Sequence, residues 1–478
     1  MAQELTFDVV VLGGGAVGEN AADRASRTGL SVAIVEHGLV GGECSYYACM
    51  PSKALLRPGA ALAAARAVPG VDITGGIRAD DVFARRDAVA SHWSDASQVR
   101  WLERVGLTLV RGHARFTGPR ELAVTAPGQD DVVVRARHAV IVATGSAPAL
   151  PPVPGLADVG PWTSRDATAA HEAPGRLVVL GGGVVGVELA TAYADLGSDV
   201  TLVVRGSRVL AGAEPLASDE VARALVGLGV RVLFDAEARS ARRDGDGIHI
   251  ELASQQLVAD RVLVATGRRP ATAGLGLEVL GLAAGRPLVV DASLQVVGVS
   301  DGWLFAAGDV TGRTATTHQG KYDARVVGDV VAARFGSDDD ARAAEAAARP
   351  WSRYRASADD AAVPQVVFTR PEVAWVGRTE AAAQAAGLRV RTLDYDLENV
   401  AGATVTSPDY RGRARLVVDD DRGVVVGATF VGPEVADLLH AATIAVVGEV
   451  PLDRLWHAVP AYPTLSEVWL RFLEAAGL

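Results

Sequence analysis

The sequence is poor in several residue types. It has only two cysteines, Cys44 and Cys49, and of its 46 basic residues only Lys53 and Lys321 are lysines. Two thiols are too few for a structural zinc site, which needs about four ligands, and a structural disulfide is not expected in a reducing compartment. The cysteine pair is therefore a candidate for redox chemistry.

Long apolar runs and a positive net charge are also absent. Apolar runs such as Val9–Leu12 and Leu177–Leu180 stop after a few residues, far short of the roughly 20 that a membrane helix needs, and the first seven residues do not resemble a secretory signal. The net charge is −11, which argues against a broad nucleic-acid surface. We therefore expect a cytoplasmic protein without nucleic-acid or membrane partners.

An internal near-repeat is the main organising feature that is present. Residues 9–18, VVVLGGGAVG, recur as residues 177–186, LVVLGGGVVG. Each copy puts a buried strand before the glycines and an alanine-rich amphipathic helix after them, and a second strand follows at 31–35 and at 199–204. A glycine turn between a strand and a helix is the context of a dinucleotide-binding unit. The sequence predicts two such units.

The first unit carries the full dinucleotide pattern. Gly13, Gly15 and Gly18 permit a tight turn, close approach of a pyrophosphate and close packing of helix against strand. Glu36 ends the next strand, where a carboxylate can accept hydrogen bonds from the ribose hydroxyls of an unphosphorylated adenosine. A glycine turn without a ligand is the alternative, and the agreement of strand, helix and distal acid disfavours it.

The second unit differs at the end of its second strand. Its glycines are Gly181, Gly183 and Gly186, but the strand ends in Arg205, with Arg208 three residues on. Arginine suits a 2′-phosphate, so the pattern favours NADPH over NADH. Gly186 argues in the other direction, because NADPH-preferring proteins often have alanine there.

The two cysteines lie at the start of a predicted helix. Pro51 suits a first helical turn, so Cys49 should lie just ahead of a helix amino terminus, where the dipole favours a thiolate. Cys44, one loop earlier, can close a small ring with it. Two unrelated buried thiols are the alternative.

At this point the sequence resembles the flavoprotein (pyridine nucleotide) disulfide oxidoreductase family, the group of glutathione reductase, dihydrolipoamide dehydrogenase and mercuric reductase. The resemblance extends over nearly the whole chain. Its landmarks are Gly13–Gly18, Cys44–Lys53, Ala143–Gly145, Gly181–Glu188, Ala265–Arg268, Gly308–Asp309, Phe368–Glu372 and Tyr462–Glu467.

The resemblance implies an α/β fold with two Rossmann-like dinucleotide-binding domains, for FAD and NAD(P), and a C-terminal α+β dimerisation domain. A proline-rich run at 148–155 marks a crossing between domains, and short alternating strands begin near residue 363. We expect residues 1–150 to be the first part of the FAD domain, 151–270 the NAD(P) domain, 271–348 the central part of the FAD domain and 349–478 the interface domain. The acidic stretch 337–350 should be a solvated connector.

The resemblance also implies roles for site residues. Cys44 would be the interchange thiol that meets substrate, and Cys49 the charge-transfer thiol beside the flavin. Lys53 and Glu188 would pair near the flavin, and Asp309 would bind its ribityl chain. The chain would form a homodimer in which Tyr462 and Glu467 enter the other subunit's active site. The remaining expected cofactor residues are Gly42, Thr144, Gly145, Gly308 and Gly267, and no metal site is expected.

One position departs from the family pattern. Disulfide-reducing members have histidine five residues before the glutamate, where this chain has Tyr462. An imidazole titrates near neutrality, whereas a phenol with a pKa of about 10 stays protonated. Rapid turnover of glutathione disulfide or lipoamide is therefore not expected. Tyrosine at this place is similar to mercuric reductase, but the extra C-terminal cysteine pair of that enzyme is not in this sequence.

The expected function is that of an FAD-dependent NAD(P)H oxidoreductase. Electrons would pass from NAD(P)H through FAD and a redox-active Cys44–Cys49 disulfide to an unidentified small-molecule acceptor: an atypical disulfide, a thiol-bound substrate or a metal. One alternative is an NAD(P)H diaphorase or quinone reductase in which the cysteines are secondary. Another is a catalytically silent flavoprotein that senses redox state.

Overall fold

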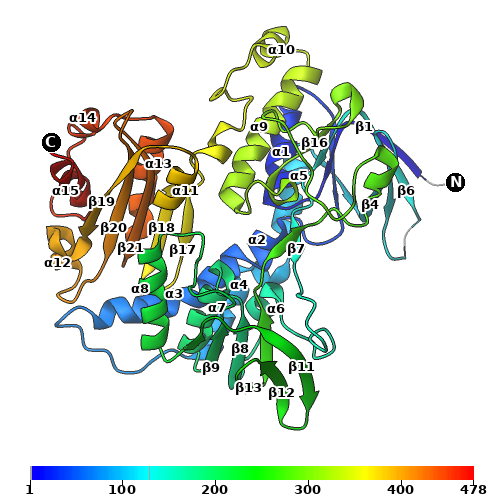
Figure 1. Ribbon diagram of the computed structural model, residues 1–478. Coiled ribbons are helices and arrows are strands. Elements are labelled where there is room, and N and C mark those ends of the chain that lie inside the picture. Colours follow the sequence, from blue (N-terminus) through cyan, green and yellow to red (C-terminus); the bar gives the residue numbers. More distant parts are fainter. Residues whose placement is uncertain (1–2, 129) are drawn as a thin grey trace. The chain divides into compact units, whose positions relative to one another are not determined.

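The computed structural model describes residues 3–128 and 130–478 (Figure 1). The chain forms two compact units, and each unit is built from three segments. The first unit comprises Met1–Met50, Asp87–Ala147 and Arg268–Asp359, and the second comprises Pro51–Arg86, Pro148–Gly267 and Asp360–Leu478. This division into compact units does not test the four-part domain assignment made from the sequence, which stays a prediction.

The first unit is built on a seven-stranded sheet in the order β3-β2-β1-β6-β5-β4, with β16 also paired to β6. Strands β1, β2, β3, β6 and β16 run parallel, and β4 and β5 add an antiparallel hairpin. The strands are β1 (Gln3–Leu12), β2 (Val32–Glu36), β3 (Thr108–Arg111), β4 (His113–Gly118), β5 (Glu121–Thr125), β6 (Val132–Val142) and β16 (Leu304–Ala306). Short strands β7 (Ser146–Pro148) and β15 (Arg268–Pro270) form a separate pair.

Both faces of this sheet are buried where its parallel strands are most apolar, over all of β2 and the last four residues of β1 and of β6. Helix α1 (Ala16–Ser26) packs along α9 (Thr317–Phe335), and both contribute to one core. The other helical segments are α2 (Gly42–Tyr46), α5 (Ala96–Arg104), α10 (Asp339–Ala346), η1 (Ser91–Trp93), η2 (Leu277–Leu280), η3 (Ser300–Gly302) and η4 (Gly308–Thr311). Helices α3 (Cys49–Arg66) and α4 (Ala79–Val89) and the turn η5 (Ser357–Asp360) run across the limits of the two units.

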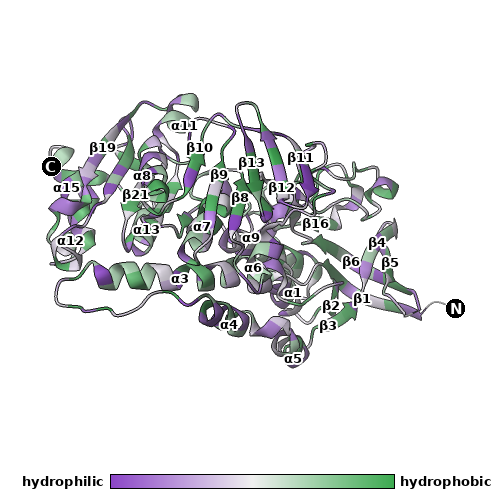
Figure 2. Cartoon of the chain, turned by 90° about the horizontal axis from the view of Figure 1, so that it is seen from below, coloured by the Kyte–Doolittle hydropathy of each residue, from purple (hydrophilic) through white to green (hydrophobic). Residues whose placement is uncertain are grey.

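The second unit holds the other copy of the repeat. Its parallel sheet has the order β10-β9-β8-β14, and the antiparallel strands β11, β12 and β13 form a separate sheet. These elements are α6 (Ser164–Ala169), β8 (Arg176–Leu180), α7 (Val184–Asp195), β9 (Asp199–Val203), α8 (Pro215–Gly227), β10 (Arg231–Leu233), β11 (Ala238–Asp244), β12 (Gly247–Leu252), β13 (Gln256–Ala259) and β14 (Arg261–Val264). Apolar residues concentrate on the parallel strands (Figure 2).

The C-terminal part of this unit is an antiparallel sheet in the order β17-β18-β21-β20-β19, with its own core. The strands are β17 (Gln365–Val367), β18 (Glu372–Gly377), β19 (Val390–Asp396), β20 (Arg413–Asp419) and β21 (Val424–Gly432). The helices are α11 (Glu380–Ala385), α12 (Ala401–Thr406), α13 (Leu439–Val447), α14 (Leu452–Leu455) and α15 (Val468–Ala475), with short turns η6 (Leu397–Asn399), η7 (Val435–Leu438) and η8 (Leu465–Glu467). The α/β architecture, both strand–helix–strand repeats and this α+β segment are confirmed.

One local expectation was partly wrong. Helix α10 does begin at the acidic run, where the Asp338 side chain accepts a hydrogen bond from the backbone N–H of Ala341. The stretch is not simply solvated, however, because Glu345 is buried between Arg334 and Arg355. Opposite charges on α9 and on the following loop compensate for the burial of that carboxylate. Among the described residues, no helix is long and apolar enough to cross a membrane.

Candidate active site

The two cysteines are brought together by a closed turn in the first unit. Cys44 lies in α2, and the backbone N–H groups of Tyr47 and Ala48 both donate to the carbonyl of Glu43, at 2.8 and 2.7 Å. The chain therefore turns back on itself before Cys49 opens α3. Both cysteines are in the reduced form in the structure, and the Cys44 side chain is hydrogen-bonded to Cys49. The pair is thus preorganised to bind one atom or to form a disulfide.

The electrostatic surroundings distinguish the two thiols. The hydrogen bond to Cys49 and burial raise the pKa of the Cys44 thiol, while Thr317 and Lys321 lower it by smaller amounts. Cys49 stands at the first position of α3, where the helix dipole favours negative charge. Its sulfur lies 3.2 Å from the hydroxyl oxygen of Thr317, at the start of α9. Cys44 is therefore the thiol that keeps its proton.

The glycine turn after β1 has the shape of a phosphate cradle. A Cβ on Gly13 would lie 2.5 Å from the carbonyl oxygen of Ala143, and one on Gly18 would lie 1.8 Å from the carbonyl oxygen of Gly13. A Cβ on Gly15, by contrast, would have no neighbour closer than 3.8 Å. Two glycines thus serve close packing, while the third leaves open space at the amino end of α1.

Glu36 lies at the end of β2, as predicted, and is buried. Its carboxylate accepts hydrogen bonds from the backbone N–H groups of Gly14, at 2.7 Å, and Gly38, at 2.5 Å. Each carboxylate oxygen has a second lone pair, so hydrogen bonds from ribose hydroxyls remain possible. Gly42 adopts φ +62°, and a Cβ there would lie 2.7 Å from Cα of Gly15. The dithiol loop therefore packs directly against the cradle.

A polar network around Asp309 was only partly expected. The Ser146 hydroxyl donates to Asp309 at 2.5 Å, and Arg268 donates to the Ser146 hydroxyl at 2.7 Å and to Glu43 at 3.0 Å. The sequence analysis assigned no role to Ser146, Arg268 or Glu43, although Arg268 ends one of its landmark motifs. The available signal was their position directly beside predicted site residues at 145, 267 and 42–44.

Thr144, Gly145 and Gly308 make hydrogen bonds that fix the turns in which they lie. The Thr144 hydroxyl donates to the carbonyl of Ala271 at 2.9 Å, and the N–H of Ala271 donates to the carbonyl of Gly145 at 2.9 Å. Gly308 has φ +76°, and its N–H donates to Asp323 at 3.2 Å. These three residues shape the loop edge on which Asp309 lies.

The second unit repeats the glycine geometry. A Cβ on Gly181 would lie 2.4 Å from the carbonyl oxygen of Ala265, one on Gly186 would lie 1.9 Å from that of Gly181, and one on Gly183 would have nothing within 4 Å. Arg205 is exposed after β9, and Arg208 is half-buried. Gly267, at φ +134°, also faces open space. The free space at Gly183 and Gly267 fits the close approach of a dinucleotide.

Lys53 and Glu188 form an ion pair within the second unit. Lys53 Nζ lies 2.7 Å from Glu188 Oε2, and the carboxylate is 4% exposed. The backbone N–H of Phe368 donates to the other carboxylate oxygen at 2.9 Å, and Lys53 Nζ lies 4.9 Å from the centroid of the Phe368 ring. The predicted pairing of Lys53 with Glu188 is therefore present, and Phe368, to which the sequence analysis assigned no role, also contacts the pair.

Comparison with known proteins decides the family. Residues 7–324 match the pyridine nucleotide-disulphide oxidoreductase family, and residues 363–472 match its dimerisation domain. The chain belongs to this family. It is an enzyme family that depends on FAD and a pyridine nucleotide, and the dimerisation domain supports a homodimer.

Relatives that are similar to this oxidoreductase over nearly their whole length are named as different enzymes. It is 34% identical to a mercuric reductase of Streptomyces lividans, over 96% of this chain and 94% of the relative, and 32% identical to a dihydrolipoyl dehydrogenase of Halobacterium salinarum, over 98% and 96%. A solved Cu(II) complex of the HOCl-induced flavoprotein disulfide reductase RclA from Escherichia coli is similar at 25% identity and a TM-score of 0.83, over 98% and 99%. LpdA from Mycobacterium tuberculosis is similar at 26% and 0.82, over 99% and 100%.

The first unit of the oxidoreductase fits FAD. It combines open space at Gly15, the buried carboxylate of Glu36 and the polar network around Asp309. These are the donor and acceptor types that an adenine dinucleotide with a ribityl chain requires.

The C-terminal residues Tyr462 and Glu467 differ in environment. Tyr462 is 77% exposed in the single chain. Glu467 is buried in η8 and accepts from the backbone N–H groups of Thr464 and Gly402, both at 3.3 Å. Within one chain, therefore, the Glu467 carboxylate stabilises the turn η8, and the Tyr462 side chain is accessible from solvent.

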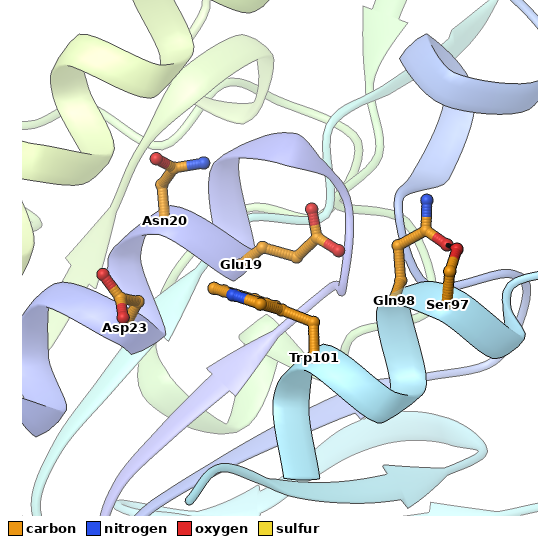
Figure 3. A pocket seen from close by; sticks show the side chains of 6 residues that line it. All are labelled: Glu19, Asn20, Asp23, Ser97, Gln98 and Trp101. Atoms are coloured by element: carbon orange, nitrogen blue, oxygen red, sulfur yellow. Dashed lines mark hydrogen bonds between the residues drawn. The ribbon is translucent and has the colours of Figure 1, made fainter. Parts of the chain in front are cut away.

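Two other polar groups fall outside the predicted site. Glu19, Asn20 and Asp23 of α1 and Ser97, Gln98 and Trp101 of α5 line a pocket of about 260 Å³ (Figure 3). Burial raises the pKa of Glu19 to about 7; the charge of Lys321 lowers it by a smaller amount, and that of Glu36 raises it slightly.

Among the described residues, the group with metal-binding geometry is Asp244, Asp246 and His249 at the β11–β12 hairpin, where Arg242 already pairs with Asp244.

Proposed function

We propose that this oxidoreductase passes electrons from NADPH, through FAD and the Cys44/Cys49 dithiol, to a soft metal ion bound by the two sulfurs. The observation that carries the proposal is Tyr462, at the place where disulfide-reducing members have histidine. Reducing a disulfide requires protons for the departing thiolates, and a phenol is a poorer proton shuttle at neutral pH than an imidazole. Reducing a metal ion requires no proton.

The relatives support a metal acceptor. Several are named mercuric reductase, and RclA was solved as a Cu(II) complex. Thiolates are ligands that soft metal ions prefer. The side chain of Cys44 is hydrogen-bonded to that of Cys49, so one ion can engage both sulfurs without a large movement of the loop.

The residues of the chain then have separate tasks. Cys44 receives the acceptor, and because its thiol keeps its proton, the metal must displace that proton on binding. Cys49 is held at the start of α3 beside Thr317 as the electron-delivering sulfur. We assign Tyr462 and Glu467 to the other subunit's dithiol, where the phenol donates a hydrogen bond. FAD, when bound, supplies the step between a two-electron donor and the sulfur pair.

The cofactor-binding residues divide between FAD and NADPH. Glu36 and Asp309 would hold FAD, while Lys53 and Glu188 would form a charged pair near its ring. Arg205 would bind the 2′-phosphate of NADPH, assisted by Arg208. We place the enzyme in the cytoplasm, where a reducing environment returns the cysteines to the dithiol form.

The experiment compares acceptors in the FAD-loaded enzyme without oxygen. With Hg(II) bound by a small thiol RSH, the balanced reaction is NADPH + Hg(SR)2 → NADP⁺ + H⁺ + Hg(0) + 2 RS⁻, and with Cu(II) two ions are reduced to Cu(I) per NADPH. We expect metal-dependent NADPH oxidation that Cys44→Ser and Cys49→Ser each abolish. Ser45→Ala, a change between the two cysteines, is the matched control and should retain the activity.

Other outcomes identify the alternatives. Faster turnover of glutathione disulfide or lipoamide than of either metal would overturn the metal assignment. Quinone reduction that survives Cys44→Ser, without metal or disulfide turnover by the wild type, would indicate a diaphorase. A flavin that NADPH does not bleach within seconds would indicate a silent redox sensor.

A further inference from the structure

Two buried carboxyl groups lie behind the Asp309 turn, and neither has a task in the proposed reaction. Asp323, on the second turn of α9, is 0% exposed, and the Asp359 side chain, in η5, is 1% exposed. An ionised carboxylate is costly to bury unless it is paired. The burial of two carboxyl groups in contact with each other therefore requires a specific explanation.

Their hydrogen bonds tie three segments together. Asp323 Oδ2 accepts from the N–H of Gly308 at 3.2 Å. Asp359 Oδ1 accepts from the side-chain amide of Gln319 at 2.6 Å, and its Oδ2 lies 3.3 Å from Arg313 Nε. The pair therefore connects the turn that carries Asp309, the first turns of α9 and the turn η5.

One oxygen of the pair needs a proton. Asp323 Oδ1 is buried and accepts no hydrogen bond from a donor among the described residues, while the Asp323 side chain is hydrogen-bonded to Asp359. Two carboxylates that face each other cannot both be ionised at low cost, and a single shared proton converts the repulsion into an O–H···O bond. Arg313 supplies one positive charge, which balances one remaining negative charge.

The surroundings of Asp323 favour its protonated form. Burial and the negative charge of Asp359 raise the pKa of Asp323 to about 8, although the Gly308 N–H and Arg313 lower it. Tyr322 on α9 also faces the pair, and its pKa is raised by its burial and by both aspartates. Tyr322 stays neutral across the range in which the pair would lose its proton.

We propose that Asp323 and Asp359 share one proton, and that this protonated pair positions the Gly308–Asp309 turn and the start of α9 for FAD. Loss of the proton would leave two adjacent buried negative charges. They would separate, and the hydrogen bonds to Gly308 and Gln319 would weaken. Both aspartates are thus positioning residues, and FAD should be held less tightly at alkaline pH.

The test measures release of FAD from the full-length holoenzyme by flavin fluorescence, between pH 6 and 9.5 and without any electron acceptor. The wild type should release FAD about tenfold faster at pH 9.5 than at pH 7. Asp323→Asn should give a slow rate that does not change with pH, because the amide can donate permanently to Asp359 and its oxygen can still accept from Gly308. Asp323→Ala removes that acceptor and should release FAD faster at every pH.

Two further variants make the result decisive. Asp359→Asn should flatten the pH profile in the same way, and it serves if Asp323→Asn does not fold. Asp340→Asn, an exposed carboxylate on α10, should keep the wild-type profile. A flat wild-type profile, or an alkaline rise that persists in both asparagine variants, would overturn the proposal. The acceptor of the enzyme does not enter this measurement.

Discussion

The hydroxyl of Thr317 lies 3.2 Å from the sulfur of Cys49, although 268 residues separate them in the chain. A hydroxyl donor at this distance stabilises a thiolate, because the charged form gains a hydrogen bond that the neutral thiol uses less well. The contact therefore assists the helix dipole of α3 in keeping Cys49 reactive.

Thr317→Val removes this donor with little change of shape. In a Cys44→Ser background, alkylation of Cys49 by iodoacetamide at neutral pH should slow roughly tenfold, as loss of one charge-assisted hydrogen bond predicts. Thr316→Val is the matched control, because that hydroxyl is buried without a hydrogen-bond partner among the described residues. Equal alkylation rates in the two variants would show that Thr317 does not act on Cys49.

Glu188→Gln leaves Lys53 without its charged partner. Because Lys53 is 35% exposed, water can replace part of the interaction, so we expect a loss of about 1–3 kcal/mol in the free energy of unfolding, measured with urea. Glu474→Gln, which breaks the exposed pair with Arg471, should cost about 0.5 kcal/mol or less. Similar losses in both variants would argue against a special role for the buried pair.

If Tyr462 reaches the other subunit's dithiol as proposed, Tyr462→His should introduce a proton shuttle there. Glutathione disulfide or lipoamide reduction should increase at least about tenfold, with a pH profile that follows an imidazole of pKa about 6.5. Tyr462→Phe, which removes the hydroxyl without adding a base, should give no increase. Failure of the histidine variant with several disulfides would mean that residue 462 does not reach the dithiol.

The arginines after β9 should determine nucleotide preference. Replacing both Arg205 and Arg208 by alanine should raise KM for NADPH roughly ten- to a hundredfold, because the lost phosphate contacts are together worth about 1.5–3 kcal/mol. KM for NADH should change little. Arg239→Ala, an exposed arginine on β11, controls for a general loss of positive charge. A parallel change in both KM values would contradict recognition of the 2′-phosphate.

Glu19 should make stability depend on pH. Its folded-state pKa, raised by burial to about 7, lies above the ordinary value of 4.5. The folded protein therefore binds more protons between these values, so the contribution of Glu19 is fully present below about pH 4.5 and is lost as pH rises through about 7. Glu19→Gln should melt progressively higher than wild type between pH 5 and pH 8. A constant difference, as expected for the exposed Glu103→Gln, would rule out a raised pKa.

The sequence alone determined the local parts of this protein. Gly13 and Gly18, Gly181 and Gly186 and the Cys44/Cys49 loop could be predicted because each depends on fixed spacing within one strand–turn–helix unit. The apolar pattern of β1, β2, β8 and β9 likewise marked the sheets. The pairing of Lys53 with Glu188 was available only through the family resemblance, since the two residues are 135 positions apart.

Tertiary structure decided the partners of these local features. Thr317 at Cys49, Phe368 at Glu188, Ser146 and Arg268 at Asp309, and the Asp323–Asp359 pair all join segments that are distant in sequence. The sequence around a hydroxyl, an amide N–H or a carboxylate contains no periodic pattern from which its hydrogen-bond partner could be predicted. The strength of the resulting interaction depends on the distance between the two groups and on their burial. Those two quantities exist only after the strands and helices have packed, so the chemistry of each thiol and carboxyl group is set by the fold.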